Sequence, residues 1–197
     1  MPARKHLFMM RPHLRGVPAP APPPEVTLRT FRYGDESDWL EVIQSGYGGH
    51  WPADTFERCV RSDEAFRPER VLIAVGGGRV LGVAGAFQKV IHGDRTGYVH
   101  MMAVRREHQR RGIGAALLRR CLEYFRGQGW LNAVLDTDAS RLPAVRLYLD
   151  HGFLPFPETA EEMETWRSAL TELDRREMAQ GLRLCSLPEG TEGAPER

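Results

Sequence analysis

Apolar residues recur every three or four positions along the middle of the chain, which is the spacing of one face of a helix. The helix predicted at residues 112–124 has an apolar face formed by Ile113, Ala116, Leu117, Leu118, Cys121, Leu122 and Phe125. Gly127 and Gly129 follow it and are typical of a helix end. Weaker helical patterns lie at residues 36–45, 55–61 and 143–151, and a charge-rich surface helix is predicted at 159–178.

Other segments follow a strand pattern, with alternating or continuous β-forming side chains. Strands are predicted at residues 26–32, 71–75, 80–87, 98–104 and 130–135. Three glycines, Gly76, Gly77 and Gly78, separate the second and third of these and can supply the positive φ of a tight hairpin turn. A second turn, at residues 92–97, leads into the fourth. Three antiparallel strands in series are therefore the simplest interpretation of residues 71–104.

A chain of 197 residues with 42% apolar content can bury one substantial core. Residues 1–24 carry seven prolines and are expected to form an extended N-terminal arm. The single folded domain is expected over residues 25–185, and residues 186–197 are expected to form a flexible tail.

The charge balance and the cysteines exclude several classes of partner. The net charge is only +1, so the whole-molecule field gives no general reason to bind nucleic acid or an anionic membrane. No apolar run approaches the length of a membrane-spanning helix. Three cysteines, Cys59, Cys121 and Cys185, show no metal-ligand spacing and leave an odd thiol under any pairing. A cytoplasmic protein with no metal site is therefore expected, and it could be a monomer or a homodimer.

A Gly-bearing turn joins the strand at residues 98–104 to the long helix. First-turn amides of a helix lack intrahelical partners, and the helix dipole adds positive potential, so residues 109–114 have the construction of an anion site. Arginines crowd this turn at positions 105, 106, 110 and 111, which favours a polyphosphate over a single carboxylate. An ordinary helix preceded by a solvated basic segment is the alternative.

Two motifs in this region resemble the GNAT acetyltransferase superfamily. The acyl-CoA loop of that family reads Gln or Arg, two residues, Gly, one residue, then Gly or Ala, and it is matched here by residues 109–114. An apolar-Ala-Val strand end precedes it, as in the family. Downstream, residues 141–153 match the family's Asn-x-x-Ala-x-x-Leu-Tyr-x-x-x-Gly-Phe pattern, except that Arg141 stands in place of Asn.

The resemblance implies an α/β (α+β) GNAT fold: a mixed, mostly antiparallel sheet of six to seven strands flanked by helices, with a V-shaped splay between the fourth and fifth strands. It implies acetyl-CoA as co-substrate, held by Met102, Ala103, Val104, Gln109, Arg110, Arg111, Gly112, Ile113, Gly114 and Ala115. Arg141 could face a CoA phosphate or be a plain surface arginine at a helix start.

Catalytic residues follow from the same resemblance. Tyr148 matches the tyrosine that protonates the departing CoA thiolate in many family members, although its ring could simply pack in the core. A base must also take a proton from the amine, and His100 and Asp138 are the candidates. His100 could equally be a structural histidine of its strand.

The acceptor site implied by the family lies near the loop after the first helix. Tyr47, His50 and Trp51 could line it, or this loop could bury its aromatic rings on the core. The expected function is transfer of acetyl from acetyl-CoA to a primary amine of a small molecule or peptide, and the alternative is a catalytically silent acyl-CoA-binding regulatory or interaction module. Residues 27–40 are also similar to the start of the catalytic half of mycothiol synthase.

Overall fold

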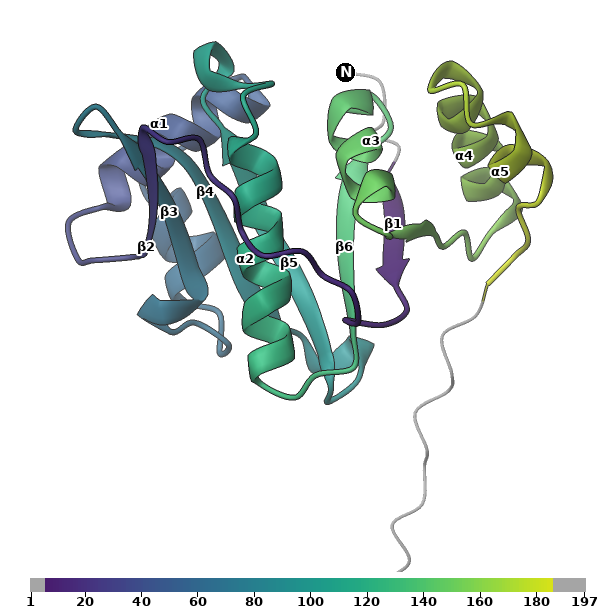
Figure 1. Cartoon of the computed structure of the whole chain (residues 1–197), viewed down its shortest axis with the longest axis horizontal. Coiled ribbons are helices and arrows are strands. Elements are labelled where there is room, and N and C mark those ends of the chain that lie inside the picture. The colour runs from purple at the N-terminus through teal and green to yellow at the C-terminus, as the bar shows by residue number, and fades with distance from the viewer. Residues whose placement is uncertain (1–5, 186–197) are drawn as a thin grey trace, which may run out of the picture.

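The computed structural model describes residues 6–185 as a seven-stranded sheet with helices on both faces (Figure 1). The strand order is β2-β3-β4-β5-β6-β1-β7. Every neighbouring pair is antiparallel except β5 and β6, which are parallel. The strands are β1 (His6–Arg11), β2 (Val26–Thr30), β3 (Val71–Gly76), β4 (Arg79–Gln88), β5 (Thr96–Val104), β6 (Asn132–Asp138) and β7 (Leu154–Pro155).

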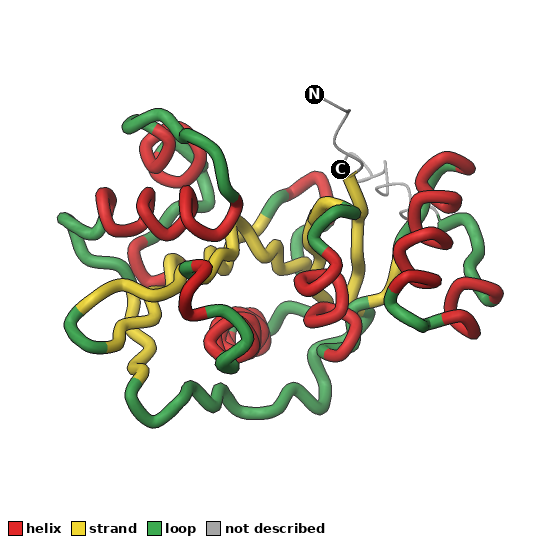
Figure 2. The backbone as a smooth tube through the Cα atoms, turned by 90° about the horizontal axis from the view of Figure 1, so that it is seen from above, coloured by secondary structure: helices red, strands yellow, loops and turns green. Residues whose placement is uncertain are grey.

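Helices lie on the two faces of this sheet (Figure 2). They enclose two apolar cores, one on each face. α1 packs on one face, with Trp39 and Ile43 buried against β3, β4 and β5. α2 and α3 pack on the other face, with Leu117 and Phe125 in its core. The helices are α1 (Glu36–Tyr47), α2 (Ile113–Gly127), α3 (Leu142–Asp150), α4 (Ala160–Glu172) and α5 (Arg176–Gln180), and a π-helical turn spans Glu57–Arg61.

The N-terminal segment forms part of the sheet, which corrects the expectation of an extended arm. β1 inserts between β6 and β7 and pairs antiparallel with both. Leu7 and Met9 are fully buried on the α3 side. Residues 12–25 then cross α2 toward β2 (Figure 1), with Leu14 and Val17 buried in the same core. The folded unit therefore includes residues 6–24.

The C-terminal helix predicted at residues 159–178 is two helices. α4 begins with a capping box between Thr159 and Glu162. It ends at Glu172, and Asp174 takes a φ of 58°, a left-handed conformation that a helix cannot continue through. Leu173 stays buried at this break, which explains why the apolar pattern runs on without interruption. The tail predicted at residues 186–197 lies outside the described residues.

The opening between β5 and β6 is the feature that positions the site. The two strands pair only from Thr96 to Tyr98, opposite residues 132–134, and then diverge (Figure 1). A bulge in β5 sharpens the divergence, because Met101 and Met102 together face the single residue Ala84 of β4, and Met101 takes a φ of 46°. The predicted fold and its V-shaped splay are confirmed. Within residues 6–185, no helix combines the length and apolar composition needed to cross a bilayer.

Candidate active site

The loop between β5 and α2 has the backbone of an anion-binding site. Arg110 and Gly112 take positive φ angles of 62° and 85°, and left-handed residues alternating in this way turn successive amides toward one concave side. The first hydrogen bond of α2 runs from the Ala116 amide to the Gly112 carbonyl at 3.0 Å. The three amides before Ala116 therefore face out of the helix end, where the dipole favours a negative ligand.

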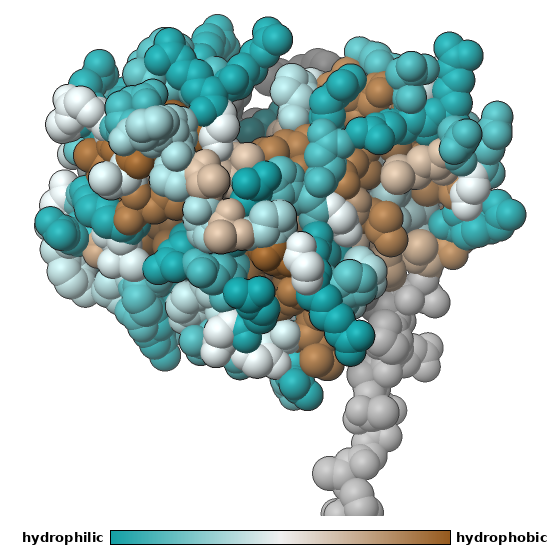
Figure 3. All heavy atoms as spheres, in the orientation of Figure 1, coloured by the Kyte–Doolittle hydropathy of each residue, from teal (hydrophilic) through white to brown (hydrophobic). Residues whose placement is uncertain are grey.

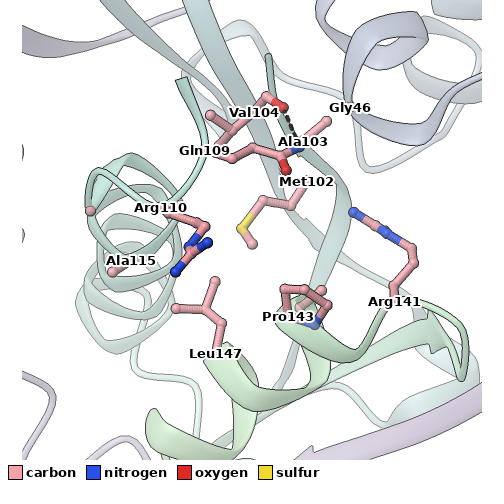
Figure 4. A pocket seen from close by; sticks show the side chains of 13 residues that line it. Gly46, Met102, Ala103, Val104, Gln109, Arg110, Ala115, Arg141, Pro143 and Leu147 are labelled. Carbon is pink, nitrogen blue, oxygen red and sulfur yellow. Dashed lines mark hydrogen bonds between the residues drawn. The ribbon is translucent and has the colours of Figure 1, made fainter. Parts of the chain in front are cut away.

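A cavity of about 350 Å³ opens beside this loop, a volume in the range of small-molecule sites. It lies between the C-terminal end of β5 and the N-terminal ends of α2 and α3, with the Arg110 and Arg141 side chains on opposite sides (Figure 4). Apolar surface is visible between these two helices in the space-filling view (Figure 3). The lining residues are Gly46, Met102, Ala103, Val104, Gln109, Arg110, Gly112, Gly114, Ala115, Arg141, Pro143, Ala144 and Leu147.

Two residues expected at the acyl-CoA site do not line this cavity. Arg111 is exposed to solvent. The Ile113 side chain is 2% exposed and packs in the core against the backbone of Gly82, so only its amide faces the helix end. The remaining residues expected there all border the cavity.

Several polar contacts fix the loop in place. Arg105 is buried, and its guanidinium donates to the Val80 carbonyl at 2.7 Å and to Glu41 at 2.8 Å. Gln109 was expected to assist a phosphate, but its Nε2 donates to the Val104 carbonyl at 3.0 Å (Figure 4). Arg105 and Gln109 therefore hold the loop to the sheet and to α1, which leaves Arg110 as the arginine of this loop on the cavity wall.

Tyr148 lies two helical turns after Arg141 on α3, on the same stripe of the helix. Its side chain is 3% exposed and meets the Phe153 ring edge to face at 6.0 Å. Burial raises the pKa of Tyr148 well above its usual range, while the nearby charge of Arg141 acts to lower it. The phenol therefore stays protonated at neutral pH, as a proton donor requires.

His100 lies on the α1 face of β5 with one ring nitrogen engaged. Its Nε2 is 2.8 Å from the Cys59 carbonyl oxygen, which can only accept, so Nε2 carries the hydrogen. The ring packs between those of Phe87 and Tyr98. Burial lowers the pKa of His100, so the ring is neutral at pH 7, and Nδ1 is the atom through which it could act as a base.

β6 extends through Asp138 instead of ending at Leu135, which places two carboxylates on the strand. Asp138 Oδ1 accepts from the Ser140 amide at 2.8 Å and from the Ser140 hydroxyl at 2.6 Å, so it stabilises the turn into α3. Asp136 is exposed, and its Oδ2 accepts from the Tyr98 hydroxyl at 3.0 Å. The Asp136–Tyr98 pair was not expected, because nothing local in the sequence connects residues on two different strands.

The loop after α1 meets the cavity through Arg141. The Arg141 guanidinium carbon is 4.1 Å from the centre of the Tyr47 ring, a cation–π distance. Tyr47 in turn contacts Trp51 at 5.8 Å, and the Trp51 indole donates to the Gly48 carbonyl at 3.0 Å. His50 is exposed. The structure thus places Tyr47 against Arg141 of the cavity wall, with Trp51 packed on Tyr47, and leaves His50 on the surface.

Gly46 is a lining residue that the sequence did not single out. A β-carbon at this position would lie 3.0 Å from the Ala103 β-carbon and 3.0 Å from the Val104 carbonyl oxygen. α1 therefore packs directly on the end of β5, and only glycine fits there without displacement. No cluster of three or more potential metal ligands occurs within the described part of the chain.

Comparison with known proteins agrees with this architecture. The profile described as "Acetyltransferase (GNAT) family" matches residues 37–153. A mycothiol acetyltransferase from Streptomyces bingchenggensis is 33% identical over 145 residues, covering 71% of this chain and 46% of that protein. Another mycothiol acetyltransferase, from Pseudarthrobacter chlorophenolicus, is 36% identical over 145 residues, covering 70% and 45%. This chain thus spans about half the length of the curated relatives it matches.

A solved structure shares the fold. The crystal structure of a GCN5-related N-acetyltransferase from Sphaerobacter thermophilus superposes with a TM-score of 0.63 at 28% identity, covering 76% of this chain and 48% of that one. The matched profile covers more than half of the chain, from α1 to the end of α3, and includes the anion-binding loop and the cavity. The chain belongs to the GNAT acetyltransferase family.

Proposed function

We propose that this chain transfers an acetyl group from acetyl-CoA to a primary amine of a small molecule or peptide, by direct attack in a complex that holds both substrates. The observation that carries this proposal is the open N-terminus of α2, with left-handed Arg110 and Gly112, beside a cavity at the point where β5 and β6 part. The residues present fit acetyl-CoA, because the loop suits a pyrophosphate and the adjoining wall is apolar enough for a pantetheine arm.

Acetyl-CoA supplies the activated acyl group, and the chain's residues bind and orient it. The amides at the start of α2 hold the pyrophosphate, and the edge of β5 from Met102 to Val104, unpaired on the β6 side, binds the pantetheine arm as a neighbouring strand would. A backbone amide of this edge donates to the thioester oxygen as charge accumulates there.

Proton transfers complete the reaction. Tyr148 donates a proton to the departing thiolate, a role supported by its place on the same stripe of α3 as Arg141, which lines the cavity. His100 takes the proton of the amine through Nδ1, because its Nε2 is engaged with Cys59. Asp138 is the other candidate base, although its Oδ1 already accepts two hydrogen bonds from Ser140.

The relatives named mycothiol acetyltransferase bear on the acceptor. They place amines related to mycothiol among the compounds to be tested, together with amino acids, alkylamines and peptides. Because this chain spans about half of their length, their substrate is one candidate among these classes.

The test is an acceptor screen that follows the release of free CoA with a thiol-reactive dye. Turnover that requires both acetyl-CoA and one class of amine supports the proposal. A thermal shift with acetyl-CoA but no turnover across the panel would indicate the catalytically silent acyl-CoA-binding module instead. No thermal shift with acetyl-CoA would refute both.

A further inference from the structure

A second group of polar and aromatic side chains lies on the α1 face of the sheet, at the apex of the splay, where β5 and β6 stop pairing. Tyr98 is the last residue of β5 that pairs with β6, where it faces Val134. Its ring belongs to the core that α1 covers, and its hydroxyl donates to Asp136 Oδ2 at 3.0 Å. The pair lies where the two strands separate, on the face opposite α2, and the steps proposed above do not use it.

A primary ammonium group lies against the ring of Tyr98. The Lys89 Nζ lies 4.6 Å from the centre of the Tyr98 ring, which is within cation–π range. Among the described residues, Lys89 forms no salt bridge with a carboxylate. The Lys89 ammonium thus lies over the Tyr98 ring without reaching the Asp136 carboxylate, and a single cation–π contact of this kind is weak enough to be displaced.

The surroundings of Tyr98 favour a positive charge. His92 and His100 stack beside it, with ring centres at 5.8 Å and 5.5 Å. Burial lowers the pKa of both histidines, so neither adds a competing positive charge at neutral pH. Asp136 acts on both rings as a nearby negative charge. An ammonium group that enters this site is attracted by Asp136 and, among the described residues, competes with the ammonium of Lys89.

We propose that Tyr98 and Asp136 form the binding site for the primary ammonium group of the acceptor, and that the Lys89 ammonium covers the Tyr98 ring of this site until the acceptor displaces it. The inference rests on the proposed function and specifies its acceptor as a cationic alkylamine of the kind a lysine side chain presents. Asp136 binds the ammonium by charge and Tyr98 by its ring. Both lie where β5 and β6 begin to separate, and the cavity borders the same strand β5 farther along, at Met102 to Val104.

The composition of the chain makes the displacement directly measurable. It has two lysines, Lys5 and Lys89, so protein labelled with ¹³C-lysine gives two Cε–Hε signals by NMR. The Lys89 signal, assigned by its loss in Lys89→Met, should lie upfield because of the Tyr98 ring current, and Tyr98→Leu should abolish that shift.

Titration with n-butylammonium chloride tests occupancy without requiring turnover. The Lys89 signal should move to its unshifted position as butylammonium binds, whereas the neutral control 1-butanol should leave it in place. Asp136→Asn should weaken the displacement about fivefold or more, since it removes the charge and keeps the shape. Tyr98→Phe, which keeps the ring, should still show an upfield Lys89 signal. A Lys89 signal that butylammonium does not move, or that 1-butanol moves equally, would overturn the proposal.

A kinetic arm uses the amine identified in the acceptor screen. Lys89→Met should lower the KM for that amine about three- to tenfold, and Asp136→Asn should raise it by at least as much. Both variants should retain the thermal shift with acetyl-CoA. If both variants keep the thermal shift with acetyl-CoA but their KM values for the amine are unchanged, the ammonium site alone is refuted. If the unmodified protein shows no thermal shift with acetyl-CoA, the proposed function itself is refuted.

Discussion

Gly112 offers a direct test of the acyl-CoA loop, because its backbone angle and its surroundings are both defined. At a φ of 85° an alanine costs about 1–2 kcal/mol in strain, and no atom lies within 4 Å of the position that its β-carbon would take, so no clash adds to that strain. Gly112→Ala should therefore lower the Tm by about 2–4 °C for each kcal/mol lost. Gly129, at the other end of α2, has a φ of 72° and equally open space, so Gly129→Ala is the matched control for strain.

Gly112→Glu then adds charge to the same strain. A carboxylate about 6 Å from a phosphate is repelled by about 3 kcal/mol at an effective dielectric constant near 20, which corresponds to about a hundredfold in affinity. Differential scanning fluorimetry with and without acetyl-CoA should show the ligand-induced shift preserved in Gly129→Ala, reduced in Gly112→Ala and lost in Gly112→Glu. An undiminished shift in Gly112→Glu would refute the assignment of the loop as the pyrophosphate site.

Three further predictions concern Tyr148, His100 and the apex of the splay. Tyr148→Phe should lower turnover about a hundredfold or more while acetyl-CoA still raises the Tm, and unaltered turnover would show that the ring only packs. Because burial lowers the pKa of His100, the unfolded chain binds the proton more tightly than the folded chain does. The free energy of unfolding, measured in urea, should therefore fall as the pH drops below about 6.5. His100→Gln should make this dependence on pH less steep, and an identical slope in the variant would contradict the reasoning. Gly97→Ala should destabilise the fold by about 1–3 kcal/mol, since its β-carbon would lie 2.3 Å from the Phe125 ring, whereas Gly127→Ala, with open space, should not.

The parts of this fold that could be predicted are those whose signals are local. The hairpins of β3, β4 and β5 follow from short β-rich runs separated by glycine turns, and α2 follows from one uninterrupted apolar stripe. The Gly-bearing turn before α2 could be predicted because the backbone of a helix start and its glycines form one continuous segment. In each case the residues that determine the structure are neighbours in sequence.

The parts that could not be predicted depend on distant partners. β1 has six residues followed by prolines, and only pairing with β6 and β7 makes it a strand. Asp136 and Tyr98 meet because β5 and β6 lie side by side, and Arg141 meets Tyr47 because α3 begins where α1 ends, at the same opening. Gln109 shows the opposite limit. Its motif position predicted a contact with phosphate, whereas in the structure it lines the cavity and its side chain donates to the Val104 carbonyl.

The insertion of β1 has a consequence for how the chain reaches its native state. β1 is made early, yet its partners β6 and β7 lie more than half the chain later. Until α2 and β6 have formed, the apolar side chains of Leu7 and Met9 have no surface to cover, and closing so long a loop carries an entropic cost. The part of the sheet formed by β6, β1 and β7 is therefore completed late. The ability to bind acetyl-CoA should then appear in a slower kinetic phase, after the rest of the sheet has formed.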